Sequence, residues 1–499
     1  MAILAAALLG IELLFLPLAG IQADEILFVA PFLKGTIPLY SWHQIPIMCM
    51  DYIGSLKSWL YFPIFQLWHF NVWSIRLPPS IFSLATLMIF GDTVRRVAGA
   101  STALFATLCL ATTSTFIFTN VYDWGPVALL LLGLAACLNL LQRYSESGGV
   151  GYLGGAFLVA GVSTWYKAIF VFPFTALLVA LAVVYFRELQ ISRRTVSCAV
   201  ICFAVGVSPL IAFNISHRGA TVRAATYIGS APPAEKALMM ARTLDGRALE
   251  HYMFRSYPRE RIPLNGAPLP DLVTSWYRGS ELGPGSALPV LLLVSLFVFP
   301  FLRKLAVFRP LLVAWIASAT TFGLMLVFRD AGAGPHHTVL VILGPAFIVA
   351  ATLTAMGQRT PRSFRPILAL AAFGLVASNV YLLSRYYAEA RQNGFSVYWT
   401  DASPELAHLI EAQSLPAAFL DWGIGDVVRV ESGDRIALAD DGEPRQGVLY
   451  VGHCRGYVID ENRMETFERK LVASGLRWIE VAKISDQHGE PVFCAGRLL

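Results

Sequence analysis

The sequence predicts an all-α polytopic membrane protein with a small soluble α/β domain at its C-terminal end, and three observations support this class. Of the 499 residues, 56% are hydrophobic and 14% are charged, whereas soluble proteins carry about 25% charged residues. The hydrophobic residues gather in eleven long runs. Residues 1–214 contain eight acidic side chains, while residues 385–499 contain eighteen together with twelve basic ones. This composition excludes a soluble enzyme, a disordered chain and a disulfide-stapled secreted module.

The eleven runs are the expected membrane-spanning helices, each of which needs about 20 mostly apolar residues. They cover approximately residues 3–21, 78–91, 99–119, 124–142, 150–165, 168–186, 196–214, 287–302, 309–328, 337–356 and 366–384. The runs at 78–91 and 150–165 are short, so we expect these helices to tilt or to extend into flanking residues. The first run resembles a signal sequence with a small-residue site near Ala19–Ala23. We expect it to be retained, because nothing basic precedes it and its removal would break the charge alternation of the loops.

Basic residues in short loops orient the spans, because Lys and Arg are enriched on the cytoplasmic side. With the N-terminus inside, the inner loops hold twelve bases: Arg95, Arg96, Arg143, Arg187, Arg193, Arg194, Arg303, Lys304, Arg309, Arg359, Arg362 and Arg365. The three shortest outer connections hold only Lys167 and Arg329. This bias places residues 22–77, residues 215–286 and the C-terminal tail on the outer side.

Two domains follow from this layout. Residues 1–384 form the transmembrane domain with outer loops at 22–77 and 215–286, and residues 385–499 form an extracytoplasmic α/β domain. In the tail we expect one helix, near residues 461–474, and four strands, at residues 417–420, 448–451, 478–484 and 491–494. Cys454 and Cys494 lie in this domain, where they are either a disulfide or two buried thiols.

Acidic residues at the outer boundary are candidates for catalysis, because ionisable groups at membrane boundaries are costly. Asp24 and Glu25 end the first apolar run; the alternative interpretation is a solvated helix terminus. Asp123 lies in a four-residue outer turn before Trp124, where an N-cap of the next helix would also explain it.

Cationic residues at the same level are candidates for binding a lipid phosphate. They are Lys57, Lys167, Arg329, His336 and His337. Each could instead be a headgroup anchor. Together with the acidic residues, these cations would place positive and negative side chains at the same level of the membrane.

The order of these motifs resembles that of the GT-C glycosyltransferases, which use lipid-linked sugars. The motifs are Asp24-Glu25, the segment from Tyr52 to Lys57, Arg76-Leu77-Pro78, the segment from Asn120 to Trp124, the turn at Lys167 and, in the tail, Asp421-Trp422-Gly423. The sequence is most similar to bacterial relatives of protein O-mannosyltransferases and of the aminoarabinose transferase of lipid A. It departs from them in one place: Trp42-His43-Gln44-Ile45-Pro46 stands where these relatives have a His-Pro-Pro-type stretch, so neither the donor nor the acceptor class follows from the motifs.

The resemblance implies an inverting glycosyltransferase in the bacterial cytoplasmic membrane that moves a sugar from a polyprenyl phosphate to a glycan, lipid or protein acceptor at the outer face. It assigns Asp24 as the general base, with Glu25 and Asp123 orienting the acceptor or the base. Lys57 is the first candidate for the donor phosphate, with Lys167, Arg329, His336 or His337 as alternatives. No cofactor is required, and a divalent metal between the acids is compatible with the layout.

Two other function classes compete with this interpretation. A transporter or lipid flippase would favour charges at mid-membrane and internal repeats, whereas here the charges gather at the outer boundary. A scaffold that anchors an outer binding domain would not need eleven spans. The basic residues do not cluster on one face, so nothing in the sequence indicates nucleic-acid binding.

Overall fold

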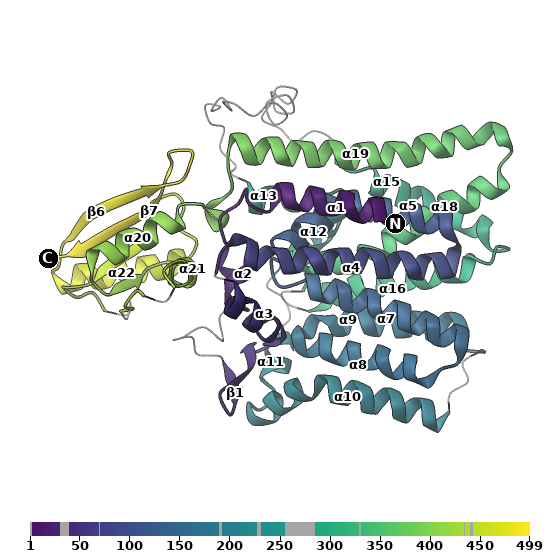
Figure 1. Ribbon diagram of the computed structural model, residues 1–499, viewed down its shortest axis with the longest axis horizontal. Coiled ribbons are helices and arrows are strands. Elements are labelled where there is room, and N and C mark those ends of the chain that lie inside the picture. Colours follow the sequence, from purple (N-terminus) through teal and green to yellow (C-terminus); the bar gives the residue numbers. More distant parts are fainter. Residues whose placement is uncertain are drawn as a thin grey trace.

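The computed structural model describes residues 2–29, 39–68, 70–188, 192–226, 231–254, 285–328, 331–433, 435–439 and 443–499. Figure 1 shows a bundle of long, roughly parallel helices with a smaller α/β domain attached at one end. The expected fold class is confirmed: a helical membrane domain followed by a small domain that contains a sheet.

Every expected span coincides with a helix or a pair of consecutive helices. These are α1 (Ala2–Phe15), α4 (Val72–Ala98), α5 (Ala100–Thr112) with α6 (Ser114–Val121), α7 (Ala128–Ser147), α8 (Val150–Tyr166), η2 (Ala168–Phe170) with α9 (Val171–Tyr185), α10 (Arg193–Ser216), α15 (Leu288–Val298) with η3 (Phe299–Leu302), α16 (Phe308–Val327), α17 (Pro335–Thr338) and η4 (Val339–Val341) with α18 (Leu343–Arg359), and α19 (Arg365–Gln392). Helix α4 extends well beyond the short run 78–91, as expected.

A strict test of length and hydropathy finds fewer membrane-crossing helices than the eleven expected from the sequence. Among the described residues, seven helices pass, or eight if α5 and α6, which bend by 61° at their junction, form one span. Helix α1 and the α15–η3 segment are apolar but shorter. The largest buried cluster extends across the bundle and includes apolar side chains of α1, α4, α5, α6, α7, α18 and α19.

The segment between α1 and α4 folds at the end of the bundle that faces the α/β domain (Figure 1). It forms α2 (Ala23–Leu27), an antiparallel sheet and α3 (Leu56–Leu67); the sheet consists of β1 (Tyr40–Trp42), β2 (Ile45–Met50) and β3 (Ile53–Gly54). The second outer loop contains α11 (Ala220–Thr226), α12 (Pro233–Leu244) and α13 (Glu250–Met253). The remainder of that expected loop, residues 227–230 and 255–284, lies outside the described residues.

The C-terminal domain is a four-stranded sheet with strand order β4-β5-β7-β6. The strands are β4 (Ala417–Phe419), β5 (Leu449–His453), β6 (Trp478–Ser485) and β7 (Pro491–Leu498), and the helices are α20 (Ser403–Gln413), α21 (Ile424–Glu431) and α22 (Glu461–Ser474). Strand β4 pairs parallel to β5, and the other pairings are antiparallel. All four expected strands and the expected helix are present. Helix α19 continues to Gln392, past residue 384, where we placed the start of this domain.

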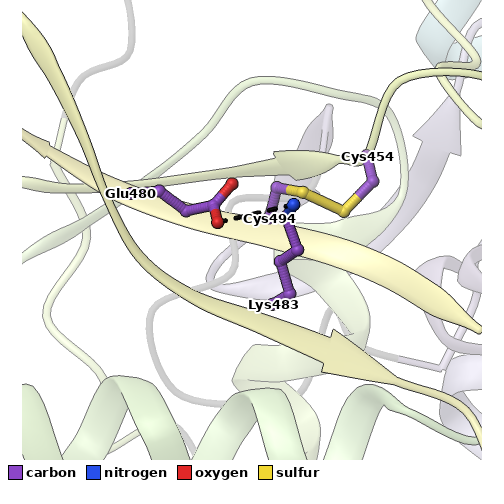
Figure 2. Close-up of a disulfide and its surroundings, with 4 residues drawn as sticks. All are labelled: Cys454, Glu480, Lys483 and Cys494. Atoms are coloured by element: carbon purple, nitrogen blue, oxygen red, sulfur yellow. Dashed lines mark ion pairs between the residues drawn. A yellow bond between two sulfur atoms is a disulfide. The ribbon is translucent and has the colours of Figure 1, made fainter. Parts of the chain in front are cut away.

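Cys454 and Cys494 form a disulfide (Figure 2), so the first of the two alternatives for this pair is the observed one. The bond joins the ends of β5 and β7 next to His453 and Phe493, which are themselves paired across the two strands. Beside it in Figure 2, Lys483 and Glu480 of β6 form an ion pair of 3.5 Å. The disulfide therefore fixes the end of the sheet where β5 carries His453.

The α/β domain packs directly on the segment that carries Asp24. The Gly20 N–H donates to the Trp399 carbonyl at 2.9 Å. A Cβ atom at Gly20 would lie 1.8 Å from the Thr400 carbonyl oxygen, so only glycine permits this approach. Val427 and Val430 of α21 join a buried cluster with Ala23 and Ile26 of α2. The linker between α19 and α20 (residues 393–402) and α21 thus pack against α2 and the residue Gly20 before it.

Candidate active site

Helix α2 presents two acids that have different environments. Its N-terminus is a capping box, in which the Gln22 side chain accepts from the backbone and the Gln22 N–H donates to Glu25 Oε1 at 3.0 Å. Arg76 of α4 makes a bidentate ion pair with Glu25, at 2.6 and 2.7 Å, and both side chains are fully buried. The remaining Arg76 donors bond the carbonyls of Leu16, Ala19 and Gly20. Glu25 therefore ties α2 to the end of α1 and to α4.

Asp24 lies in a different environment. Its carboxylate accepts a hydrogen bond from Trp124, and the charged groups that act on it most strongly are Lys167 and Lys57. Burial raises the pKa of Asp24 above its usual value, although the two lysines and the indole oppose that rise. A carboxylate with a raised pKa near two cations is suited to accept a proton near neutral pH.

Asp123 both binds the start of a helix and pairs with Lys57. Its Oδ1 accepts from the N–H groups of Val127 and Ala128, each at 2.9 Å, and so satisfies free donors at the start of α7. The expectation that Asp123 is itself the N-cap was wrong, because α7 begins at Ala128 and its N-cap is Val127. Its Oδ2 lies 2.7 Å from Lys57 Nζ, with side chains 5% and 1% exposed. The backbone of Asp123 is left-handed, with φ 41°, a conformation that short polar side chains tolerate better than others. The turn thereby directs the carboxylate toward α3.

Lys57 and Lys167 are brought together by a close contact between two loops. Ile53 forms a β-bridge with Lys167, and the Ala168 N–H donates to the Tyr52 carbonyl at 2.9 Å. A Cβ at Gly54 would lie 2.5 Å from the Trp165 carbonyl oxygen, so a larger residue would separate the loops. The glycine in the Tyr52–Lys57 motif is therefore needed to bring Lys57 to the Lys167 turn.

The Lys167 ammonium is buried and donates to the Gly125 carbonyl. Burial lowers the pKa of Lys167 to about 8, although Asp24 and Asp123 oppose this effect. This amine is therefore mostly protonated at pH 7, and an anion bound beside it would raise its pKa and favour the charged form further.

The two histidines lie beside the same turn. The His336 ring packs on Trp124 with centroids 5.0 Å apart and on His337 at 4.1 Å. His336 Nδ1 is buried and has no hydrogen-bond partner among the described residues. Arg329 lies outside the described residues. The structure thus gathers Asp24, Asp123, both lysines and His336 around Trp124 and Gly125, whereas Glu25 belongs to the neighbouring Arg76 pair.

Two functional neighbours were not assigned a role from the sequence. Trp124 donates to Asp24, and Arg76 holds Glu25. From the sequence, Arg76 is identified only as part of the Arg76-Leu77-Pro78 motif. Its partner Glu25 lies 51 residues earlier in the sequence, and no local pattern connects the two residues. In the described part of the chain, no group of three or more His, Cys, Asp and Glu side chains has the arrangement of a metal site.

Comparisons with known proteins point to one fold. The family model described as dolichyl-phosphate-mannose-protein mannosyltransferase matches residues 55–213. ArnT from Cupriavidus metallidurans, solved with undecaprenyl phosphate, aligns over 99% of this chain and 97% of its own, at 14% identity and a TM-score of 0.57. The chain has the GT-C fold.

A second neighbour with the GT-C fold is the archaeal oligosaccharyltransferase AglB from Archaeoglobus fulgidus, solved with an inhibitory peptide and a dolichol-phosphate. It aligns over 99% of this chain and 74% of its own, at 10% identity and a TM-score of 0.53. Comparison with curated protein sequences gives no significant match. At these identities the likeness establishes the fold, and the chemistry has to be argued from the residues described above.

Proposed function

We propose that the protein is an inverting glycosyltransferase that moves a sugar from a polyprenyl-phosphate donor to an acceptor hydroxyl at the outer face of the membrane. The observation that carries this proposal is the cluster of Asp24, Lys57 and Lys167 at one end of a bundle with the GT-C fold. ArnT was solved with undecaprenyl phosphate and AglB with dolichol-phosphate, which supports a lipid phosphate as the donor's carrier.

In the proposed reaction, Asp24 takes the proton of the acceptor hydroxyl. The hydroxyl oxygen attacks the anomeric carbon as the bond from that carbon to the phosphate oxygen breaks. The polyprenyl phosphate leaves with the bonding electron pair, and attack from the opposite face inverts the anomeric configuration. A positioned base typically contributes about 10²–10⁴-fold to the rate, and the raised pKa of Asp24 suits this role.

The departing phosphate gains negative charge, so a fixed cation beside it stabilises the transition state. Lys57 is the first candidate: its buried ammonium forms an ion pair with Asp123 but makes no hydrogen bond within the described residues, so its N–H groups are available to a phosphate. Lys167 is the second, because it lies close enough to Asp24 to influence its charge. His336, His337 and Arg329 are weaker alternatives.

The remaining acids are proposed to act through position. Asp123 fixes Lys57 and binds the start of α7, while Glu25 holds α2, and with it Asp24, against Arg76. Two lysines balance Asp24 and Asp123 in charge, so we propose a reaction with no required metal. Transfer that survives treatment with a metal chelator would support this part; loss of transfer restored by a divalent ion would contradict it.

The proposed location is the bacterial cytoplasmic membrane, with the site and the α/β domain outside. The twelve bases in the predicted inner loops support this orientation. Arg95 and Arg96 lie in the last turn of α4, at the end of the bundle away from the α/β domain (Figure 1). Arg76, near the start of α4, pairs with Glu25 of α2, so Arg95 and Arg96 lie at the opposite end of this helix from the site.

The test uses Asp24→Asn, which keeps the size of the side chain but removes the base. Membranes containing the protein are supplied with a panel of undecaprenyl-phosphate sugars labelled in the sugar. The labelled sugar that has been transferred from undecaprenyl phosphate is then measured separately in the glycan, lipid and protein fractions. We expect wild-type transfer into one fraction and at least about a 100-fold loss in Asp24→Asn.

The matched control is Asp51→Asn, which makes the same change at an exposed position in the same outer segment and should leave transfer unchanged. Transfer by Asp24→Asn at the wild-type rate would remove Asp24 from the mechanism and leave it as a helix terminus.

A further inference from the structure

Basic side chains around two neighbouring connections form an exposed patch at the end of the bundle away from the α/β domain. One connection joins η3 to α16, and the other joins α18 to α19, which starts at that end (Figure 1). Arg359 Nη1 donates to the Phe301 carbonyl at 3.1 Å, so the two connections are in contact. We call their five exposed bases the basic patch: Arg303, Lys304, Arg359, Arg362 and Arg365.

The basic patch has no acidic residues to balance it. Between Gly285 and Ala388 the sequence contains one acidic residue, Asp330, which follows the far end of α16 and lies outside the described residues. Within the described part of the chain, no ion pair joins a patch base to an acid. Four other bases at this end of the bundle do pair with acids, at 2.5–3.1 Å: Arg95, Arg96, Arg143 and Arg309.

The unpaired bases are suited to bind a phosphate. Like charges on two contacting connections repel one another, and an anion bound among them relieves that repulsion. Four of the five bases are arginines, whose planar guanidinium groups bind phosphate through two parallel hydrogen bonds. Arg362 begins the short helix η5 (Arg362–Phe364), and Arg365 follows three residues later at the start of α19. This spacing places both side chains on the same side of the turn.

Apolar side chains adjoin the basic patch on the bundle side. Phe297 of α15 and Phe301 of η3 are 69% and 75% exposed, and Ile367 and Leu370 of α19 are 60% and 67% exposed. These residues belong to apolar helices of the membrane domain, so we expect them to face acyl chains. A ligand at this place therefore meets cations at one level and an apolar surface at the next. An anionic phospholipid has the complementary order of groups.

We propose that the basic patch binds the headgroup of an anionic phospholipid, with the acyl chains against the exposed side chains of α15, η3 and α19. A zwitterionic headgroup fits less well, because its ammonium group would lie next to unpaired bases. In the orientation proposed above, the site faces the cytoplasmic leaflet, where anionic lipids attract basic segments. The proposal does not depend on sugar transfer, because the basic patch and the Asp24 cluster lie at opposite ends of the bundle.

The first experiment compares two lipids that differ only in the headgroup. Purified full-length protein in a non-ionic detergent is mixed with phosphatidylglycerol or with phosphatidylcholine of identical acyl chains. Bound lipid is measured by native mass spectrometry. We expect phosphatidylglycerol to bind at least about tenfold more tightly, because several bases contribute to its attraction. Equal affinity for the two lipids would overturn the proposal.

Two variants each remove two charges from the basic patch. One combines Arg303→Gln with Lys304→Gln, and the other combines Arg362→Gln with Arg365→Gln. Arg359 stays in place because it joins the two connections. Each variant should bind phosphatidylglycerol about tenfold more weakly and phosphatidylcholine as wild type does. All four side chains are exposed, and two separate variants keep the test decisive if one of them fails to fold.

The matched control combines Arg95→Gln with Arg96→Gln. It removes the same number of charges at the same end of the bundle, from bases that already pair with Asp92. This control should bind phosphatidylglycerol like wild type. An equal loss of affinity in the control and in the patch variants would show that binding follows net charge alone. That result would overturn the assignment of a site to the basic patch.

Two further measurements identify the ligand and separate this proposal from the proposed function. Glycerol phosphate, which lacks acyl chains, should not displace phosphatidylglycerol at equal concentration; displacement would mean a site for free phosphate and would overturn the proposal. Lys57→Ala should weaken undecaprenyl phosphate and leave phosphatidylglycerol unaffected. If Lys57→Ala instead removes phosphatidylglycerol while the patch variants retain it, the lipid occupies the proposed donor site, and the basic patch is not a lipid site.

Discussion

Burial shifts the pKa values of Asp24 and Lys167 in opposite directions. It raises the pKa of Asp24 above its usual value and lowers that of Lys167 to about 8. In the proposed mechanism Asp24 must be deprotonated to act as a base, and Lys167 must be protonated to attract phosphate. Transfer therefore requires the deprotonated form of Asp24, which is favoured as pH rises, and the protonated form of Lys167, which is favoured as pH falls.

The pH dependence of kcat/KM should consequently be bell-shaped. Transfer should fall as pH drops through the raised pKa of Asp24, and should fall again above about pH 8 as Lys167 loses its proton. Lys167→Arg should remove the alkaline limb, because arginine stays charged. An identical alkaline limb in wild type and Lys167→Arg would mean that another group controls it.

The sequence identified the acids and lysines of the site because charged residues are rare in the first 214 positions. It could not reveal their pairings. Lys57 contacts Asp123 across 66 residues, and Arg76 contacts Glu25 across 51. Only the packing of α3 and α4 against the turns determines which acid stays available, so the separate roles of Asp24 and Glu25 required the structure.

At the scale of elements, α2 has only five residues and is too short to be stable alone. The Glu25–Arg76 pair, the Gln22 cap and α21 hold it in place. The sequence located the helices of the bundle because a membrane-spanning helix is apolar along its length, whether its side chains face lipid or other helices. It did not give the number of spans: eleven were expected, and among the described residues seven or eight helices are long and apolar enough to cross a membrane. It missed α20 and α21, since these short amphipathic helices become stable only against the sheet.

Breaking the Glu25–Arg76 pair should therefore destabilise the protein. Arg76→Gln leaves a buried carboxylate without its cation, which typically costs about 3–5 kcal/mol. The measurement is the unfolding midpoint in detergent, with Arg95→Gln as the control, because Arg95 also pairs with an acid but is 57% exposed. We expect a large fall for Arg76→Gln and a small one for Arg95→Gln. Equal shifts would show that α2 is held by other contacts.

At the scale of the whole molecule, α2 and α3, which carry Asp24 and Lys57, lie at the end of the bundle that carries the α/β domain (Figure 1). The Lys57–Asp123 ion pair and the bridge between Ile53 and Lys167 bring the other charged residues to the same end. A soluble acceptor and a membrane-bound donor can meet only at such a boundary, because a polyprenyl chain does not leave the bilayer. The arrangement of the bundle and the α/β domain thus matches the reaction that the cluster is proposed to perform.

The orientation of the molecule can be tested by reporter fusions. Fusions after Arg96 and after residue 390 should report opposite sides of the membrane, with the first in the cytoplasm. The twelve inner bases predict this result. If both fusions report the same side, the proposed topology is wrong, and the site would then require a different arrangement of the spans.

The central claim is that the lysines beside Asp24, and Lys57 first, bind the phosphate of a lipid-linked donor. Its most direct test is the affinity of the purified protein for undecaprenyl phosphate. Lys57→Ala should bind it about ten- to a hundredfold more weakly, as for the loss of a charge-assisted hydrogen bond, while Lys57→Arg should retain part of the affinity. Unchanged affinity in Lys57→Ala would contradict the assignment and leave Lys57 as the structural partner of Asp123.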